Sequence, residues 1–285
     1  MLHYHQAFHE LRHALQPLYD AREAAAIAHE VLYHVTGLDK LQRISQQETP
    51  LTAAQEAELQ RCLRALRSGE PLQYVLGHAW FLGRRYRVDR HVLIPRPETE
   101  ELVQWIVADR QQCAAPGDLL DIGTGSGCIA VSLKLMLLSA RVEACDISSE
   151  ALDVARANAQ EQGADVRFFQ ADILDEKGWP LLPLYDVLVS NPPYIPVTEK
   201  DTLHSNVKDF EPSLALFTPG DDPLLFYRAI ALLGMQRLTP GGAVYCELHR
   251  DYAEATAALF IQQGYKNVTI RRDMHGNPRM LKAAR

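Results

Sequence analysis

Residues Asn191-Pro192-Pro193-Tyr194 combine groups that could hold a planar nitrogen for chemistry. The nitrogen of an amide, or of an aromatic exocyclic amine, is a poor nucleophile because its lone pair is delocalised. Such a nitrogen carries two hydrogens, and the side-chain carbonyl of Asn191 and the backbone carbonyl of Pro192 can accept both. Holding both hydrogens would direct the lone pair towards a methyl group and stabilise the positive charge that grows on nitrogen. The tetrad therefore indicates methyl transfer to a planar nitrogen.

The remaining residues of the tetrad support the same chemistry. The prolines restrict the loop, so that its geometry is formed before the substrate arrives, and Tyr194 offers an aromatic face to a planar group. We expect Asn191, Pro192 and Tyr194 to be catalytic, and all four residues, Pro193 included, to bind the substrate. A proline-stiffened turn without a chemical role is the alternative. The substrate stays open, because adenine-N6, RNA guanine and protein-glutamine methyltransferases share such loops.

A glycine-rich loop, GTGSG, lies upstream between an expected strand and an expected helix. Glycine lets the backbone turn tightly and approach a ligand closely. The GxGxG spacing differs from the GxGxxG of dinucleotide sites, so a cofactor without phosphates, such as S-adenosylmethionine, fits better. A purely structural turn is the alternative. The residues expected to contact the cofactor here are Gly123, Thr124, Gly125, Ser126 and Gly127.

Carboxylates follow the next two expected strands. Asp146 ends one of them, and a carboxylate there can accept both ribose hydroxyls of the cofactor. Asp172 lies just past the other strand and is placed either to meet an adenine amino group or to cap a turn. Asp121 precedes the glycine loop and either orients it or faces the sulfonium side of the cofactor.

Alternating strand and helix patterns from residue 97 onwards would position these groups. Strands are expected at 118–122, 141–146, 166–170, 185–190, 243–247, 267–272 and 279–283. Helices are expected at 98–112, from the glycine loop to 138, and at 149–162, 224–238 and 251–263. Repeated β-α units predict an α/β fold with a parallel, doubly wound, Rossmann-like sheet. Ligands then bind at the carboxyl ends of the strands, where both loops lie.

The N-terminal part of the chain is predicted to be helical. Apolar residues recur at helical spacing in 20–37, and Thr52 with Gln55 makes a capping-box pattern before another helix. In 74–96, β-forming residues alternate with turn residues, which predicts a β-hairpin. The expected organisation is a helical domain at 1–73, a hairpin linker at 74–96 and the α/β domain at 97–285.

Three further segments narrow the family: Gly69–Gly77 (GEPLQYVLG), His91–Glu100 (HVLIPRPETE) and Glu211–Leu216 (EPSLAL). Together with DIGTGSG and NPPYIP, they make the chain resemble the PrmC/HemK family, the release factor glutamine N5-methyltransferases. The resemblance covers nearly the whole chain. Its most specific element is the IPRPETE segment.

That resemblance implies a seven-stranded class I methyltransferase domain behind a small helical domain that recognises the substrate. It implies S-adenosylmethionine as the methyl donor. The implied acceptor is the side-chain N5 of the glutamine in the Gly-Gly-Gln motif of class 1 peptide chain release factors, a modification that modulates translation termination. Cofactor contacts are implied for Gly123–Gly127, Asp146, Ile173 (the residue after Asp172) and Asn191. The NPPY tetrad would hold the glutamine.

Charge argues against the runner-up function, a nucleic-acid methyltransferase that acts on adenine or guanine. Such an enzyme would flip a base out of its stack and would need a basic channel. The formal net charge is −7, and residues 1–80 carry 7 Lys+Arg against 9 Asp+Glu. We therefore expect no direct contact with nucleic acid. Two further alternatives are a cofactor-binding module without catalysis, which would not need Asn191, and a dinucleotide oxidoreductase, which the glycine spacing disfavours.

Arginines concentrate on the expected hairpin, at positions 84, 85, 87, 90 and 96. They form either a solvated edge or a contact with the release factor or with RNA near it.

Cysteine usage and hydropathy indicate the compartment. The 5 cysteines include no CxxC pair, which is typical of reduced, buried thiols in the cytoplasm. The N-terminus is too polar for a signal peptide, and no apolar run approaches the roughly 18 residues of a membrane span.

His5, His9 and His13 share a helical face, but neither cysteines nor paired acidic residues complete a metal site there. We therefore expect no metal.

Overall fold

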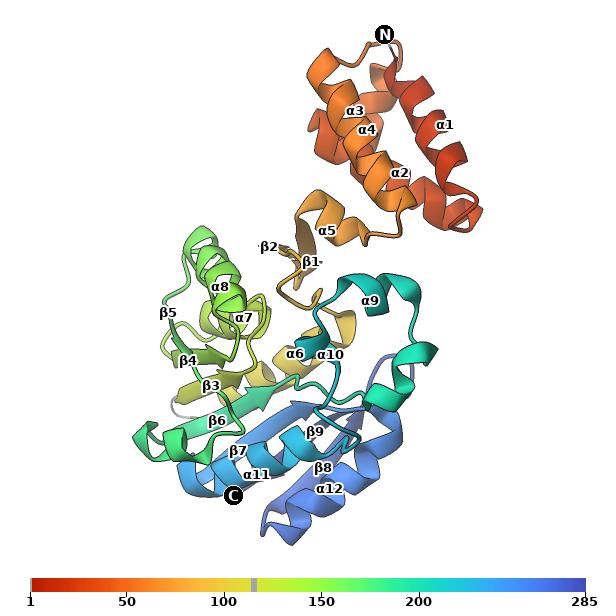
Figure 1. Ribbon diagram of the computed structural model, residues 1–285. Helices are drawn as coiled ribbons and strands as arrows, with labels where there is room; N and C mark the ends of the chain where they lie inside the picture. Colours follow the sequence, from red (N-terminus) through yellow and green to blue (C-terminus); the bar gives the residue numbers. More distant parts are fainter. Residues whose placement is uncertain (1, 114–116) are drawn as a thin grey trace. The chain divides into compact units, whose positions relative to one another are not determined.

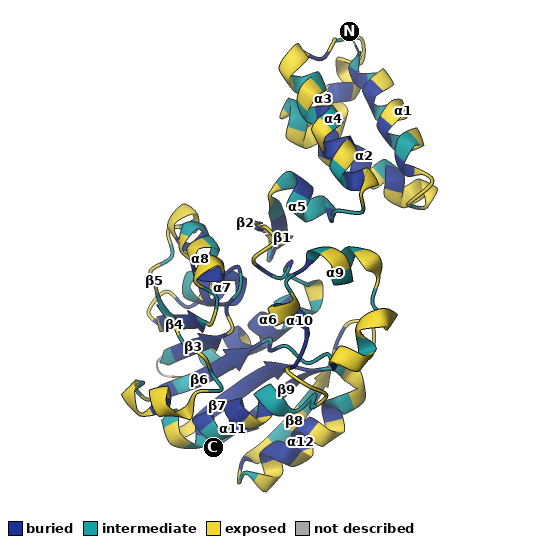
Figure 2. Ribbon diagram, viewed as in Figure 1, coloured by how far each residue is buried: buried dark blue, intermediate teal, exposed yellow. Residues whose placement is uncertain are grey.

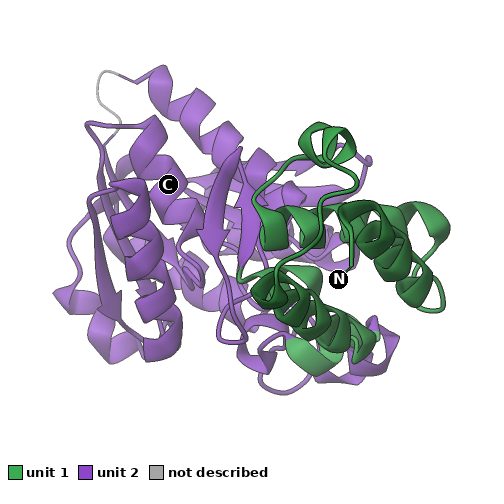
Figure 3. Ribbon diagram, turned by 90° about the horizontal axis from the view of Figure 1, so that it is seen from above, with its two compact units in different colours: residues 1–77, 205–210 green, residues 78–204, 211–285 purple. Residues whose placement is uncertain are grey.

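The computed structural model describes residues 2–113 and 117–285, and these form two compact units (Figure 3). The helical unit contains the chain up to Gly77 together with Ser205–Phe210. The α/β unit contains His78–His204 and Glu211–Arg285. A segment that follows the NPPY tetrad therefore belongs to the helical unit, and the chain then returns to the α/β unit. The sequence patterns do not indicate this exchange. They place the end of the helical domain at residue 73, whereas the structure places it at Gly77.

The helical unit is built from amphipathic helices (Figure 1): α1 (Tyr4–Leu15), α2 (Ala21–Thr36), α3 (Lys40–Ser45), α4 (Ala53–Arg67), α5 (Leu72–Leu76) and α9 (Ser205–Phe210). The predicted capping box is present at the start of α4, where Thr52 and Gln55 satisfy each other's backbone amides. The apolar faces of α1, α2 and α4 meet in one core, which includes Leu11, Val31 and Leu59. Burial of each such side chain contributes about 1.5–3 kcal/mol to folding.

Helix α9 contacts the segments that connect the N-terminal helices. The Tyr19 hydroxyl shares a hydrogen bond with Asn206 of α9. Phe210 packs so close to Gly69 that a Cβ at this glycine would lie 3.6 Å from the ring. These contacts explain why Ser205–Phe210 folds with the helical unit although it is far away in the sequence.

The predicted hairpin at 74–96 is wrong at both ends. Tyr74 to Leu76 belong to α5, a short helix that buries Val75 and ends at Gly77, where φ is 73°. Residues 88–96 contain no strand either, although Val88 and Ile94 are buried. The apolar residues of this segment pack against neighbouring elements without forming a strand. Such packing overrides the intrinsic strand propensity of these residue types.

The hairpin itself consists of β1 (His78–Phe81) and β2 (Arg84–Arg87), which pair in antiparallel fashion. Two of its arginines bind helix α8 (Ser149–Gln162). Arg87 forms an ion pair with Glu161, and Arg84 donates to Gln162 across 3.3 Å. Both arginines are exposed, as expected for a solvated edge, and they also contact α8 within the α/β unit.

The α/β unit contains a seven-stranded sheet in the order β5-β4-β3-β6-β7-β9-β8. All strands run parallel except β9, which is antiparallel to both of its neighbours, so the expected parallel sheet is mixed at one edge. The strands are β3 (Asp118–Ile122), β4 (Arg141–Asp146), β5 (Val166–Gln170), β6 (Tyr185–Ser190), β7 (Leu238–Glu247), β8 (Lys266–Arg272) and β9 (Pro278–Ala284). The Rossmann-like architecture is confirmed.

Helices cover both faces of this sheet, as Figure 1 shows. One apolar cluster joins α6 (Pro97–Gln111) and α7 (Cys128–Met136) to the sheet, and a second joins α11 (Leu225–Arg237) and α12 (Ala253–Gln262). The central strands are accordingly dark blue in Figure 2, which marks buried residues. Shorter elements complete the unit: α10 (Ser213–Leu216) and the 3₁₀ helices η1 (Glu176–Leu181), η2 (Val197–Thr202) and η3 (Arg250–Tyr252).

Cysteine burial follows the expectation with one exception. Cys62, Cys128, Cys145 and Cys246 are free and buried, whereas Cys113 is exposed. The prediction of a buried thiol was wrong at Cys113, which lies beyond the C-terminal end of α6. Among the residues described, no helix has both the length and the apolar character needed to cross a membrane.

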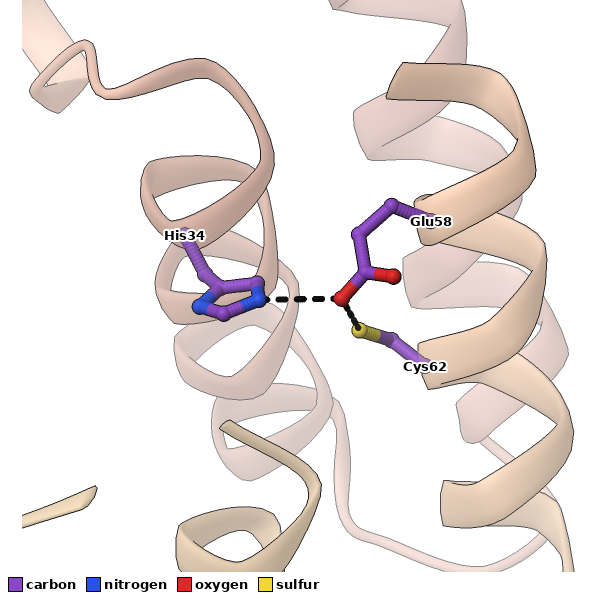
Figure 4. Close-up of side chains that lie close together, drawn as sticks. All are labelled: His34, Glu58 and Cys62. Carbon is purple, nitrogen blue, oxygen red and sulfur yellow. Dashed lines mark hydrogen bonds and ion pairs between the residues drawn. The ribbon is translucent and has the colours of Figure 1, made fainter. Parts of the chain in front are cut away.

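A group of three possible metal ligands lies in the helical unit, where sequence spacing gave no hint of it (Figure 4). Glu58 accepts from His34 Nε2 at 3.0 Å and lies 3.7 Å from the Cys62 sulfur. Arg61 donates to the same carboxylate at 2.7 Å, and this bond lowers the pKa of Glu58 to about 2. Burial raises the pKa of the Cys62 thiol to about 11. Because a guanidinium already neutralises Glu58 and the thiol holds its proton, we interpret the group as a polar bridge between α2 and α4.

Candidate active site

The glycine loop and the NPPY tetrad meet at the point where the strand order reverses. β3 pairs with β4 on one side and with β6 on the other, which is the switch point where doubly wound sheets bind ligands. Ile122 lies opposite Ser190 in the β3–β6 register, and the Ser190 hydroxyl donates to the Ile122 carbonyl at 2.7 Å. The glycine loop and the NPPY tetrad begin at the next residues. Strand pairing therefore places them side by side.

A cavity of about 460 Å³ opens at this edge of the sheet. This volume lies within the range of roughly 300–1,000 Å³ that is typical of small-molecule sites. Its walls are mainly apolar, with a few polar groups from the two loops and from the ends of β4 and β5. The predicted site residues that line it are Gly123, Thr124, Gly125, Ser126, Asp146, Asp172, Ile173, Asn191, Pro192 and Pro193.

The glycine loop needs glycine for its backbone conformation. Gly123 and Gly125 have φ of 70° and 54°, in the left-handed region that other residues rarely adopt. A Cβ at either position would meet no protein atom within 4 Å, so the described residues leave room there for a ligand. Gly127 differs, because its Cβ would lie 3.0 Å from the Cβ of Ala155 on α8. We therefore assign Gly127, which does not line the cavity, to close helix packing.

Asp121 orients the glycine loop from inside the core. Its Oδ2 accepts a hydrogen bond from the Thr124 hydroxyl at 2.6 Å and another from the Ala130 amide at 3.2 Å. The side chain is fully buried, and burial raises its pKa to about 7. Of the two roles that the sequence left open, the loop-orienting role fits these contacts.

Asp146 lies where β4 ends and joins two parts of the site. One carboxylate oxygen accepts from the Gly125 amide at 2.9 Å, and the other accepts from the Ser148 amide at 3.0 Å. Burial raises the pKa of this carboxyl group, and the backbone amides counteract the shift. Each oxygen keeps a second lone pair, so the carboxylate can still accept hydroxyl groups from the cavity.

Asp172 and Ile173 form the wall of the cavity beyond β5. Asp172 Oδ1 accepts from the Leu174 amide at 2.8 Å, which is a turn of the Asx type. The turn-capping alternative is thus present, although it leaves the second oxygen of Asp172 for a ligand. Ile173 adds an apolar side chain beside it.

The tetrad follows β6 and splits into two parts. Asn191, Pro192 and Pro193 line the cavity. Asn191 Nδ2 donates to the Thr99 hydroxyl across 3.3 Å, which leaves its carbonyl oxygen without a donor among the described residues. Tyr194 does not line the cavity; its hydroxyl donates to Glu247 at 3.2 Å, and its ring meets His249 edge to face. Stacking of Tyr194 on a substrate stays a prediction.

Comparison with known proteins places this chain in a family. A profile for the methyltransferase small domain matches residues 99–209, and one for the PrmC N-terminal domain matches residues 6–77. The release factor glutamine methyltransferase of Bacteroides thetaiotaomicron is 42% identical over 275 residues, covering 96% of this chain and 98% of that relative. The enzyme of the same name from Flavobacterium psychrophilum is 38% identical and covers 94% of both chains.

The chain belongs to the release factor glutamine methyltransferase family. It is therefore an enzyme of the methyltransferase class, as the sequence motifs predicted. Among solved structures, a methyltransferase from Pyrococcus furiosus shares the fold, with a TM-score of 0.52 and 16% identity over 82% of this chain and 98% of that one.

Other members of this site escaped the sequence analysis. Thr99 in the first turn of α6 and Glu247 at the end of β7 contact the tetrad. Glu211 is buried, forms an ion pair with Arg96 and accepts from the Ile94 amide. The IPRPETE and EPSLAL segments were recognised as family motifs, but nothing in their spacing showed that they bind each other.

Proposed function

We propose that this chain transfers the methyl group of S-adenosylmethionine to the side-chain N5 of the glutamine in the Gly-Gly-Gln motif of class 1 release factors. The observation that carries the proposal is the juxtaposition of the glycine loop and the NPPY tetrad across the β3–β6 pair. Family membership supports the substrate class. We place the reaction in the cytoplasm, and the expected absence of direct nucleic-acid contact remains part of the proposal.

The cavity suits S-adenosylmethionine in size and in the groups that line it. Gly123 and Gly125 would let the cofactor approach the backbone, Asp146 would accept its ribose hydroxyls, and Asp172 with Ile173 would flank its adenine. No phosphate-binding cluster is needed for such a ligand. The chemistry that the cofactor supplies is a methyl group on a sulfonium, which departs as a neutral thioether.

Asn191 and Pro192 would act on the glutamine amide. The carbonyl oxygen of Asn191 and the backbone carbonyl of Pro192 would each accept one hydrogen of the amide NH₂. The nitrogen lone pair is then directed at the methyl group, and the growing positive charge faces two carbonyl dipoles. A new N–C bond forms as the S–C bond breaks, and the nitrogen afterwards loses one proton to water. Pro192 and Pro193 keep the loop in this geometry before the substrate binds.

The helical unit is proposed to recognise the release factor. It has its own core and includes α9, the segment that the chain contributes between the tetrad and Glu211. The segment containing β1 and β2 is proposed as the linker that follows it, although it counts with the α/β unit.

Transfer of labelled methyl from S-adenosylmethionine to a purified class 1 release factor tests the proposal. The control substrate is the same factor with the glutamine of its Gly-Gly-Gln motif changed to alanine. Label on the wild-type factor alone supports the proposal. Label on RNA or DNA offered in parallel, with none on the factor, would overturn it in favour of nucleic-acid methylation.

A further inference from the structure

Glu247 is a buried carboxylate beside the reactive loop. It is the last residue of β7, and the preceding residue, Cys246, lies opposite Ser190 in the β6–β7 register. Glu247 therefore lies level with Asn191, and its side chain is only 2% exposed. The Tyr227 hydroxyl donates to the Glu247 backbone carbonyl at 2.9 Å and fixes the strand end.

Two residues donate hydrogen bonds to this carboxylate. The Thr99 hydroxyl donates to Oε2 at 2.6 Å, and the Tyr194 hydroxyl donates to Oε1 at 3.2 Å. A hydroxyl that donates its one proton to Glu247 can only accept elsewhere. Thr99 accordingly accepts from Asn191 Nδ2 at 3.3 Å.

The direction of these hydrogen bonds, from Asn191 to Thr99 and from Thr99 to Glu247, decides which end of the Asn191 amide faces the cavity. The amide NH₂ is turned towards Thr99, so the carbonyl oxygen is the end that remains for a ligand. A substrate NH₂ needs an acceptor at that position, and the reverse orientation of the Asn191 amide would present a donor instead.

The charge of Glu247 is costly where it lies. The positive charge of Arg279 favours the ionised form of Glu247, but its guanidinium binds Asp273 at 3.5 Å and the Leu248 carbonyl at 3.1 Å instead. Glu98 adds a repulsive field, and burial disfavours the ionised form. A buried charge without a direct ion pair lowers the stability of a fold, and the hydrogen bonds from Thr99 and Tyr194 offset part of that cost.

We propose that Glu247 is a positioning residue that, through Thr99, sets the orientation of the Asn191 amide and, through the Tyr194 hydroxyl, sets the place of the Tyr194 ring. The inference deepens the proposed function and rests on it for its catalytic consequence. The amide orientation itself is a property of the protein and can be observed without substrate.

Glu247→Gln keeps the shape of the side chain and disrupts the direction of the hydrogen bonds. A glutamine side chain has an acceptor oxygen at one position and a donor nitrogen at the other. Either Thr99 or Tyr194 must therefore accept from the nitrogen. If Thr99 accepts, its hydroxyl proton turns to Asn191 and favours the reversed amide. Thr99→Val removes the link without change of volume, and Thr99→Ser keeps it.

Glu143→Gln is the matched control. Glu143 is also a buried carboxylate on a strand, and it accepts from the Tyr185 hydroxyl at 2.6 Å. Its other partners are Arg141 and Arg167, so it contacts neither Thr99 nor the tetrad. We expect Glu143→Gln to lower stability and leave turnover unchanged.

Two measurements test the inference. In kinetics with a release factor, Thr99→Val and Glu247→Gln should lower kcat about 10- to 100-fold, with KM changed far less, and Thr99→Ser should restore most of the turnover. In ¹⁵N–¹H spectra of the free enzyme, the Asn191 NH₂ signals, assigned by their loss in Asn191→Ala, should move in Thr99→Val and Glu247→Gln but not in Thr99→Ser or Glu143→Gln.

Unmoved Asn191 signals, or wild-type turnover in Glu247→Gln and Thr99→Val, would overturn the inference. An equal loss of turnover in Glu143→Gln would also overturn it, because the effect would then be general damage to the fold. If the wild type methylates no release factor, the proposed function fails, and the spectra still decide the role of Glu247.

Discussion

The Asp146 carboxylate accepts a hydrogen bond from the Gly125 backbone amide at 2.9 Å, and this bond ties the end of β4 to the glycine loop that follows β3. Both residues line the same cavity. One carboxylate thereby holds the loop in shape and remains available to a ligand, so changes at Asp146 should act first on cofactor binding.

We predict that Asp146→Ala weakens S-adenosylmethionine binding by about 10- to 100-fold, the loss expected for one or two charge-assisted hydrogen bonds. At saturating cofactor, turnover should fall much less. Titration calorimetry measures the affinity, and Asp153→Ala, an exposed carboxylate of α8 paired with Arg156, is the control. An unchanged affinity in Asp146→Ala would count against the ribose contact.

Asn191→Ala should lower kcat by about 100-fold or more, the scale seen when one positioned polar contact to a transition state is removed. The reason is that alanine cannot accept a hydrogen of the substrate NH₂. Single-turnover methyl transfer measures this step, with cofactor affinity determined on the same preparation. Turnover close to that of the wild type would refute the proposed role of Asn191.

Gly127→Ala should destabilise the fold more than Gly163→Ala does. Both glycines have positive φ, 78° and 67°, so each substitution costs about 1–3 kcal/mol in backbone strain. At Gly127 the new Cβ would also lie 3.0 Å from Ala155, whereas at Gly163 it would meet nothing within 4 Å. Denaturant unfolding of the two variants measures the difference, and equal losses would show that α8 yields without cost.

Asp121 should make stability fall as the pH rises. Burial lifts its pKa from the ordinary 3.8 to about 7 in the folded state, so the folded protein binds the proton more tightly than the unfolded chain. This contribution is fully present below about pH 4 and is lost as the pH rises towards 7. Asp121→Asn does not titrate.

The melting temperature of Asp121→Asn relative to the wild type should therefore increase between about pH 5 and pH 8. Thermal unfolding of both proteins over this range measures the difference, in which other titrating groups cancel. A difference that stays constant with pH would contradict the raised pKa of Asp121.

Much of this protein could be predicted because the responsible interactions are local. Strand and helix periodicity marked the sheet, and Thr52 with Gln55 marked the start of α4, because caps form between residues three apart. The loops at Gly123 and Asn191 could be placed at one edge of the sheet, since parallel strands bring their carboxyl ends together. For the same reason, motif spacing sufficed to indicate the class of chemistry.

Only the tertiary structure decided what surrounds the tetrad. Thr99 and Glu247 are 148 positions apart, and they meet because α6 packs on the sheet next to the end of β7. The exchange of Ser205–Phe210 into the helical unit depends likewise on distant contacts, and helix α5 is held to α4 by the hydrogen bond from Arg61 to the Val75 carbonyl. Such contacts leave no periodic trace in the chain, because the free energy of each depends on how separate elements pack, not on neighbouring residues.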